Sequence, residues 1–140
     1  MKMMISTLTL AAAFTAILAV APASAEMLAF KADLKGASEV PPTDSPATGT
    51  AQVDVDTATK EVKWTVQYSG LTGDATAAHI HGPAVVGENA GPVVDISGKI
   101  ESGSATLTDA QIADLQAGKM YLNIHSAKFP DGEIRGQLAK

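Results

Sequence analysis

The sequence predicts an all-β fold, an antiparallel β-sandwich with one short α-helix. About seven short segments alternate apolar and polar residues with a period of two, as expected for strands that bury one face. Turns rich in glycine, proline, aspartate and serine separate these segments. A single segment has the pattern of a helix start instead. These three observations decide the fold class.

The N-terminal half contains the clearest strands. Residues 28–34 alternate strictly, and the two prolines of residues 36–42 then break the pattern because they lack a backbone N–H donor. A second strand follows at residues 51–56 and a third at residues 61–68. Trp64 is the only tryptophan of the chain, and we expect its large ring in the core.

The C-terminal half contains shorter strands. One carries the run from Thr76 to His81 and ends at Gly82-Pro83, and the next covers residues 92–96. Ser102-Gly103-Ser104 is interpreted as a break. Further strands are expected at residues 120–124 and 133–138, with a turn between them. The number and spacing of strands favour a Greek-key-like, Ig-like sandwich.

The one helix is predicted from its two ends. Thr108 lies three residues before Gln111, which is the spacing of a capping box. Gly118 is a residue that commonly follows the last turn of a helix. We therefore expect one short helix from about Asp109 to Ala117.

The first 25 residues have the features of a cleaved signal peptide. Lys2 gives a positive start, residues 8–20 are apolar, and Ala23-Ser24-Ala25 is a small-residue cleavage site. We expect cleavage after Ala25 and one domain over residues 26–140. The apolar run is too short for a membrane span, so the mature chain should be exported to the periplasm or secreted.

Composition excludes several functions. The chain has 15 acidic and 10 basic residues, a net charge of −5, and its basic residues are not clustered. This argues against binding nucleic acid or anionic membrane surfaces. The chain has no cysteine, so disulfides, thiol catalysis and a blue-copper thiolate ligand are excluded.

All three histidines of the chain fall in predicted strands. His79 and His81 are two residues apart, so their side chains share one face of a strand. His125 shares its strand face with Tyr121 and Asn123. Two imidazoles directed into one small volume, with a third nearby, indicate a binding site for a cation or an anion.

The histidines have two competing interpretations. In the first, His79, His81 and His125 bind one Cu²⁺ or Zn²⁺ ion, and a water or a carboxylate is the fourth ligand. Tyr121 or Asn123 would then orient an imidazole. In the second, the histidines hydrogen-bond backbone groups and hold the strands together. The candidate carboxylates are Glu88, Asp95 and Glu133.

Other catalytic arrangements have less support. Ser126 follows His125 directly, and neighbours on a strand point to opposite faces, so they do not form a nucleophile–base pair. Glu133 and Arg135 share a strand face, and we expect an ion pair there that is solvated or supports the sheet, without a catalytic role.

Four motifs in order resemble the CHRD domain, a module named after chordin that also occurs as stand-alone secreted bacterial proteins. They cover about residues 30–138. The resemblance implies a β-sandwich, an extracellular setting, and motif histidines at His79, His81 and His125. The motifs are AHIHGPA (78–84), GPVV (91–94), GKMYLNIHS (118–126) and FPDGEIRGQL (129–138).

We therefore expect an exported, single-domain CHRD binding module without enzymatic activity, which binds copper or zinc through the three histidines. The alternative is a metal-free extracellular domain that binds a protein or a glycan. A third hypothesis is a mononuclear copper redox enzyme. The His-x-His strand is similar to that of copper,zinc superoxide dismutases, but their dinuclear site needs more imidazoles than this chain has.

Overall fold

The computed structural model describes residue 21 and residues 24–140. Most of the expected signal peptide, residues 1–20 and 22–23, lies outside the described residues, so cleavage after Ala25 stays a prediction. Within the described part, no helix is long and apolar enough to cross a membrane.

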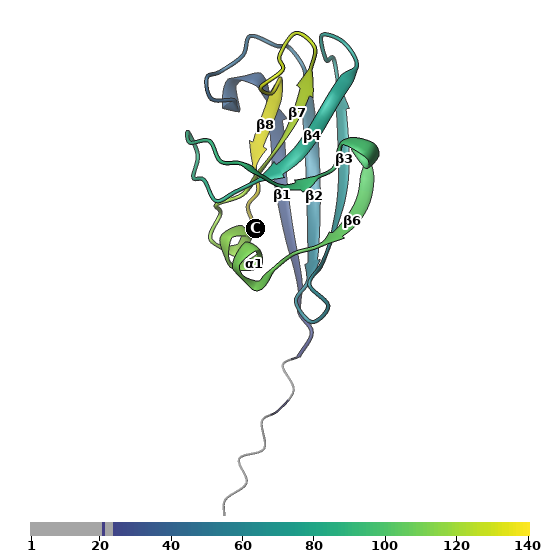
Figure 1. Ribbon diagram of the computed structural model, residues 1–140, viewed down its shortest axis with the longest axis vertical. Helices are drawn as coiled ribbons and strands as arrows, with labels where there is room; N and C mark the ends of the chain where they lie inside the picture. The colour runs from purple at the N-terminus through teal and green to yellow at the C-terminus, as the bar shows by residue number, and fades with distance from the viewer. Residues whose placement is uncertain (1–20, 22–23) are drawn as a thin grey trace, which may run out of the picture.

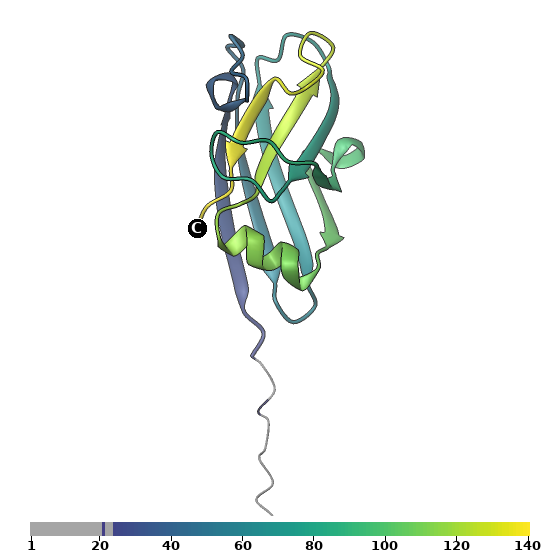
Figure 2. The same cartoon turned by 60° about the vertical axis from the view of Figure 1, so that its left-hand side comes forward.

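Eight antiparallel strands form one sheet that curves nearly into a barrel (Figures 1 and 2). The order across the sheet is β5-β4-β7-β8-β1-β2-β3-β6. The strands are β1 (Met27–Lys35), β2 (Thr48–Asp56), β3 (Glu61–Ser69), β4 (Ala75–His81), β5 (Pro92–Asp95), β6 (Ser102–Thr106), β7 (Tyr121–Ser126) and β8 (Ile134–Gln137). Two single-turn 3₁₀ helices, η1 (Gly36–Ser38) and η2 (Ser97–Lys99), lie between strands.

The core lies inside the curved sheet. Every second residue of β1, from Leu28 to Leu34, is buried, and β1 pairs with β2 over its whole length. Trp64 on β3 is buried as expected. This alternation is what stabilises a strand with one face on an apolar interior. It confirms the period-two prediction for the first three strands.

The expected Greek-key-like, Ig-like sandwich is not confirmed. The two halves β5-β4-β7-β8 and β1-β2-β3-β6 form one continuous sheet. Strands β1 and β8 join the halves through the register pair Lys35–Arg135, and the isolated bridge Lys31–Ala139 lies nearby. Alternation shows which face of a strand is buried, but it does not show which strands pair. The all-β class and the antiparallel pairing are confirmed.

The interpretation of Ser102-Gly103-Ser104 as a break is wrong. These residues belong to β6, which pairs with β3 and places Gly103 opposite Trp64. A Cβ atom at Gly103 would overlap the indole ring of Trp64. The glycine therefore lets the ring cover the strand, and the indole N–H donates to Lys99 O at 2.8 Å. Glycine marks a close approach here instead of a chain break.

The predicted helix is confirmed as α1 (Asp109–Gln116). Gln111 N donates to Thr108 Oγ1 at 3.2 Å and Thr108 N donates to Gln111 Oε1 at 2.9 Å, which completes the capping box. Gly118 has φ +71°, as expected after the last turn. The helix leads into β7 at the end of the sheet opposite the β7–β8 turn (Figure 1).

Candidate metal centre

The three histidines meet because β4 and β7 are neighbours in the sheet. His79 and His81 come from β4, and His125 comes from β7. The register pairs His79 with Asn123 and Ala77 with His125. Residues that share a face on paired strands lie side by side. One ring nitrogen from each histidine lies within 4.8 Å of the others.

Two of the imidazoles have a backbone acceptor at Nδ1, and the third lies near a carboxylate. His81 Nδ1 lies 2.9 Å from Ala90 O, in the β4–β5 loop. His125 Nδ1 lies 2.8 Å from Pro130 O, in the β7–β8 turn. His79 Nε2 faces the exposed Asp95 carboxylate at 3.8 Å. The two backbone carbonyls fix which nitrogen of His81 and His125 carries the proton.

The other three ring nitrogens turn toward one point. His79 Nδ1 and His125 Nε2 are 3.2 Å apart. The side-chain oxygen of Asn123 lies 2.9 Å from His81 Nε2 and 3.0 Å from His125 Nε2. His81 and His125 thus face an oxygen at both ring nitrogens, although a neutral imidazole has only one N–H to donate. A cation at this point would satisfy the lone pairs that remain.

Burial favours the neutral form of two of these rings. It lowers the pKa of His79, an effect to which His125 adds and which Asp95 opposes. It also lowers the pKa of His81, although the oxygens of Ala90 and Asn123 beside its two ring nitrogens oppose this effect. Because a metal binds the neutral imidazole, lower pKa values extend the pH range in which these rings can act as ligands.

A stack of side chains supports His81 from behind. The Tyr121 ring lies 4.7 Å from the His81 ring at an interplanar angle of 2°, and the Arg135 guanidinium lies 3.4 Å from the Tyr121 ring centre. The Tyr121 hydroxyl donates to Ala90 O at 3.1 Å, so it also holds the carbonyl that orients His81. Arg135 donates to Glu88 O at 2.6 Å and ties down the same loop.

The comparison with protein families covers most of the chain. The family model of the CHRD domain matches residues 30–138. The chain belongs to the CHRD domain family. No curated protein gives a significant match to it, and no solved structure does so either. All three histidines of this CHRD domain lie inside the matched range.

The expected ion pair between Glu133 and Arg135 is wrong. The exposed fractions of the two residues are 0% and 1%. Arg135 stacks on Tyr121, while the Glu133 carboxylate accepts from Ser45 Oγ at 2.6 Å and from Thr72 N at 2.8 Å. The β4–β5 loop covers Arg135, which donates to Glu88 O and to Asn89 Oδ1, and this explains why a charged residue of β8 is buried.

The three candidate carboxylates have different surroundings. Burial raises the pKa of Glu133, but hydrogen bonds from Ser126, Ser45 and Thr72 outweigh it and lower the pKa overall. Through these hydrogen bonds, Glu133 holds in place the segments that contain Ser45 and Thr72. Asp95 is the candidate whose carboxylate lies against a histidine. Its pKa is lowered chiefly by hydrogen bonds to Ser97, so it stays ionised beside His79.

No sequence pattern points to Glu39, a buried carboxyl group next to Asn123. Its exposed fraction is 5%, and Oε1 has no hydrogen-bond partner among the described residues. Burial raises the pKa of Glu39 to about 7, against the opposing effects of Arg135 and Asn123. Glu39 lies among residues 36–42, where the two prolines break the strand pattern. No periodic pattern distinguishes it there from an exposed loop glutamate.

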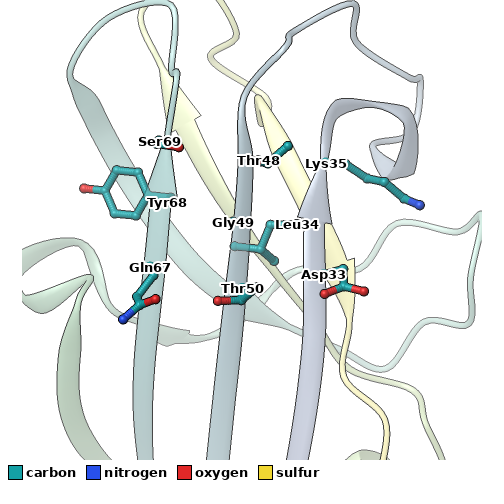
Figure 3. A pocket seen from close by; sticks show the side chains of 9 residues that line it. All are labelled: Asp33, Leu34, Lys35, Thr48, Gly49, Thr50, Gln67, Tyr68 and Ser69. Carbon is teal, nitrogen blue, oxygen red and sulfur yellow. The ribbon is translucent and has the colours of Figure 1, made fainter.

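A shallow depression on β1, β2 and β3 is separate from the histidines (Figure 3). Gly49 is one of the residues that line it, and a Cβ atom there would lie 3.1 Å from Leu34 Cδ1 and 3.1 Å from Tyr68 Cβ. It shares no residue with the histidine cluster. The depression is lined by Asp33, Leu34, Lys35, Thr48, Gly49, Thr50, Gln67, Tyr68 and Ser69.

Proposed function

We propose that this CHRD domain is a non-enzymatic binding module for one copper or zinc ion, which acts after export from the cytoplasm. The ligands would be His79 Nδ1, His81 Nε2 and His125 Nε2. One observation carries the proposal: His81 and His125 each have Nδ1 on a backbone carbonyl, His79 Nε2 lies on the side of Asp95, and the other nitrogen of each ring turns toward the same point. Histidines that bind metals are typically oriented in this way.

The spacing and chemistry of the donors support a transition metal. Bonds of about 2.0–2.1 Å to a tetrahedral ion separate the ligand atoms by roughly 3.3 Å. The 3.2 Å between His79 Nδ1 and His125 Nε2 already fits this value, and the nitrogen of His81, which lies within 4.8 Å of both, would move closer on binding. Imidazole nitrogens suit copper and zinc, whereas calcium and magnesium prefer oxygen ligands.

The test is metal analysis of the exported protein. The full chain, with its own leader, should be expressed and purified without a histidine tag or chelators. We expect about one equivalent of copper or zinc, as for a mononuclear site. The variant His79→Ala/His81→Ala should lose the metal and keep the far-UV circular dichroism of a folded sheet. Thr76→Ala, at an exposed position of the same strand, is the matched control and should keep the metal.

Wild-type protein that is metal-free and takes up neither ion would disprove this function. The histidines would then have a structural role in the β4–β7 pair. The alternative of a metal-free domain that binds a protein or glycan would become the better hypothesis.

A further inference from the structure

We propose that Asn123 supplies the fourth ligand through Oδ1, and that Glu39 positions it, so that three nitrogens and one oxygen enclose the metal. This inference rests on the proposed function, because it concerns the same ion. From the sequence alone, a water or a carboxylate is expected as the fourth ligand. An amide oxygen takes this position instead. The inference also specifies how much of the coordination sphere the protein fills.

The position of the amide oxygen carries the first step. Asn123 Oδ1 lies almost equally far from His81 Nε2 and His125 Nε2, at 2.9 Å and 3.0 Å. These distances resemble the 3.2 Å between His79 Nδ1 and His125 Nε2. Because both Nδ1 atoms face carbonyls, the two Nε2 atoms have no proton left for the amide oxygen. Four lone-pair donors therefore surround one point.

The second step is the orientation of the amide. A Cβ atom built on Gly132 would overlap both Asn123 Nδ2 and Glu39 Oε1. The NH₂ end of Asn123 therefore lies on the side of Glu39, and Oδ1 lies on the side of the histidines. Because Glu39 Oε1 has no hydrogen-bond partner among the described residues, it is free to accept from Nδ2, which favours this orientation over the reversed one. Gly132 has φ +131°, a conformation that also favours glycine and keeps this space open for both side chains.

The third step is what four protein ligands do to the site. Asn123 has an exposed fraction of 2%, and both His81 and His125 are buried. Zinc sites with four protein ligands hold the metal, whereas catalytic sites keep one position for water or substrate. A filled coordination sphere means that this domain retains or transfers the ion as cargo. It leaves no position where a small oxidant could bind the metal.

The experiment asks whether an added anion can reach the metal. Wild-type protein loaded with Cu²⁺ is titrated with azide and followed by visible absorption and electron paramagnetic resonance. We expect no azide-to-copper charge-transfer band for the wild type. Asn123→Leu, which has similar volume but no oxygen donor, should develop the band and change its copper resonance spectrum. The exchange variant Glu39→Gln/Asn123→Asp keeps an oxygen donor and should resist azide as the wild type does.

An azide band in the wild type would overturn the four-ligand site while leaving metal binding intact. Wild-type protein without copper would overturn both proposals, and elemental analysis distinguishes the two failures. If Asn123→Leu does not fold, the wild-type titration alone still decides. An azide band in the exchange variant with none in the wild type would argue against the positioning role of Glu39.

Discussion

At the scale of single residues, Glu39 is a carboxyl group that folding removes from water. Its pKa rises to about 7 in the folded chain, from 4.5 as an ordinary glutamate. Between these two values the folded protein binds more protons at this position than the unfolded chain does. Stability from this group is therefore greatest at low pH and falls as pH rises from 4.5 to about 7.

The substitution Glu39→Gln should remove this pH dependence. As pH rises, the buried Glu39 side chain of the wild type becomes ionised, and this charge destabilises the fold. The variant has no such charge, so it should gain free energy of unfolding, relative to the wild type, between about pH 5 and pH 8. The pKa shift sets an upper limit of about 3 kcal/mol on the gain. Urea unfolding of both proteins in the presence of EDTA measures it. A difference that stays constant over this range would show that Glu39 does not titrate as described.

At the scale of elements, β6 depends on one glycine. Gly103 lies under the indole ring of Trp64, while the ring nitrogen donates to Lys99 O just before β6. At Gly103, β6 presents only its backbone to β3, so the indole ring of Trp64 can lie directly on the strand. This contact holds the edge of the eight-stranded sheet at β6.

We expect Gly103→Ala to lower the free energy of unfolding by about 1–3 kcal/mol, because the added methyl group overlaps the ring and forces a shift. Gly98→Ala is the matched control, since nothing lies within 4 Å of a Cβ atom at that position. Its effect should be no more than about 0.5 kcal/mol. Denaturant unfolding followed by the fluorescence of Trp64 measures both. Equal effects of the two substitutions would contradict this account of β6.

Local patterns predicted the elements that depend on local physics. Strict alternation gave β1, and the pairing of Thr108 with Gln111 gave α1. Because side chains alternate along a strand, the spacing of two residues also predicted that His79 and His81 share a face. His125 lies close to these two histidines because β7 is the neighbour of β4 in the sheet. The alternation of residues does not predict which strands are neighbours. For the same reason, the alternation does not show that the β4–β5 loop covers Arg135.

At the scale of the whole molecule, the candidate site connects both halves of the sheet. The histidines belong to β4 and β7, whereas Glu39 comes from the connection between β1 and β2. In the same region, Asn89 Nδ2 donates to Val40 O at 2.8 Å and links the β4–β5 loop to that connection. An ion held here should therefore stabilise the domain as one unit.

Metal should raise the melting temperature of the wild-type protein. An ion at a hundred times its Kd adds about 2.7 kcal/mol to the free energy of unfolding if it binds the folded state alone. For a domain of this size, this corresponds to a rise of roughly 10 °C. Differential scanning fluorimetry with added Cu²⁺ or Zn²⁺, and reversal by EDTA, measures the rise.

Acid should abolish this stabilisation, because protons compete with the metal for the imidazoles. Since burial holds the pKa values of His79 and His81 below 6.5, the rise should persist at pH 6.5 and disappear at lower pH. His79→Ala/His81→Ala should melt at the same temperature with and without metal. A rise in melting temperature for this variant would locate the ion elsewhere.

The acceptors at Nδ1 of His81 and His125 belong to the main chain, at Ala90 and Pro130. Every amino acid carries the same carbonyl, so a point mutation at either residue keeps the acceptor wherever the loop path is kept. An alanine scan would therefore overlook two of the atoms on which the site depends. A change in the length of either loop would instead move these carbonyls. A one-residue deletion between His81 and Pro92 should disturb the site more than most replacements of side chains in that loop.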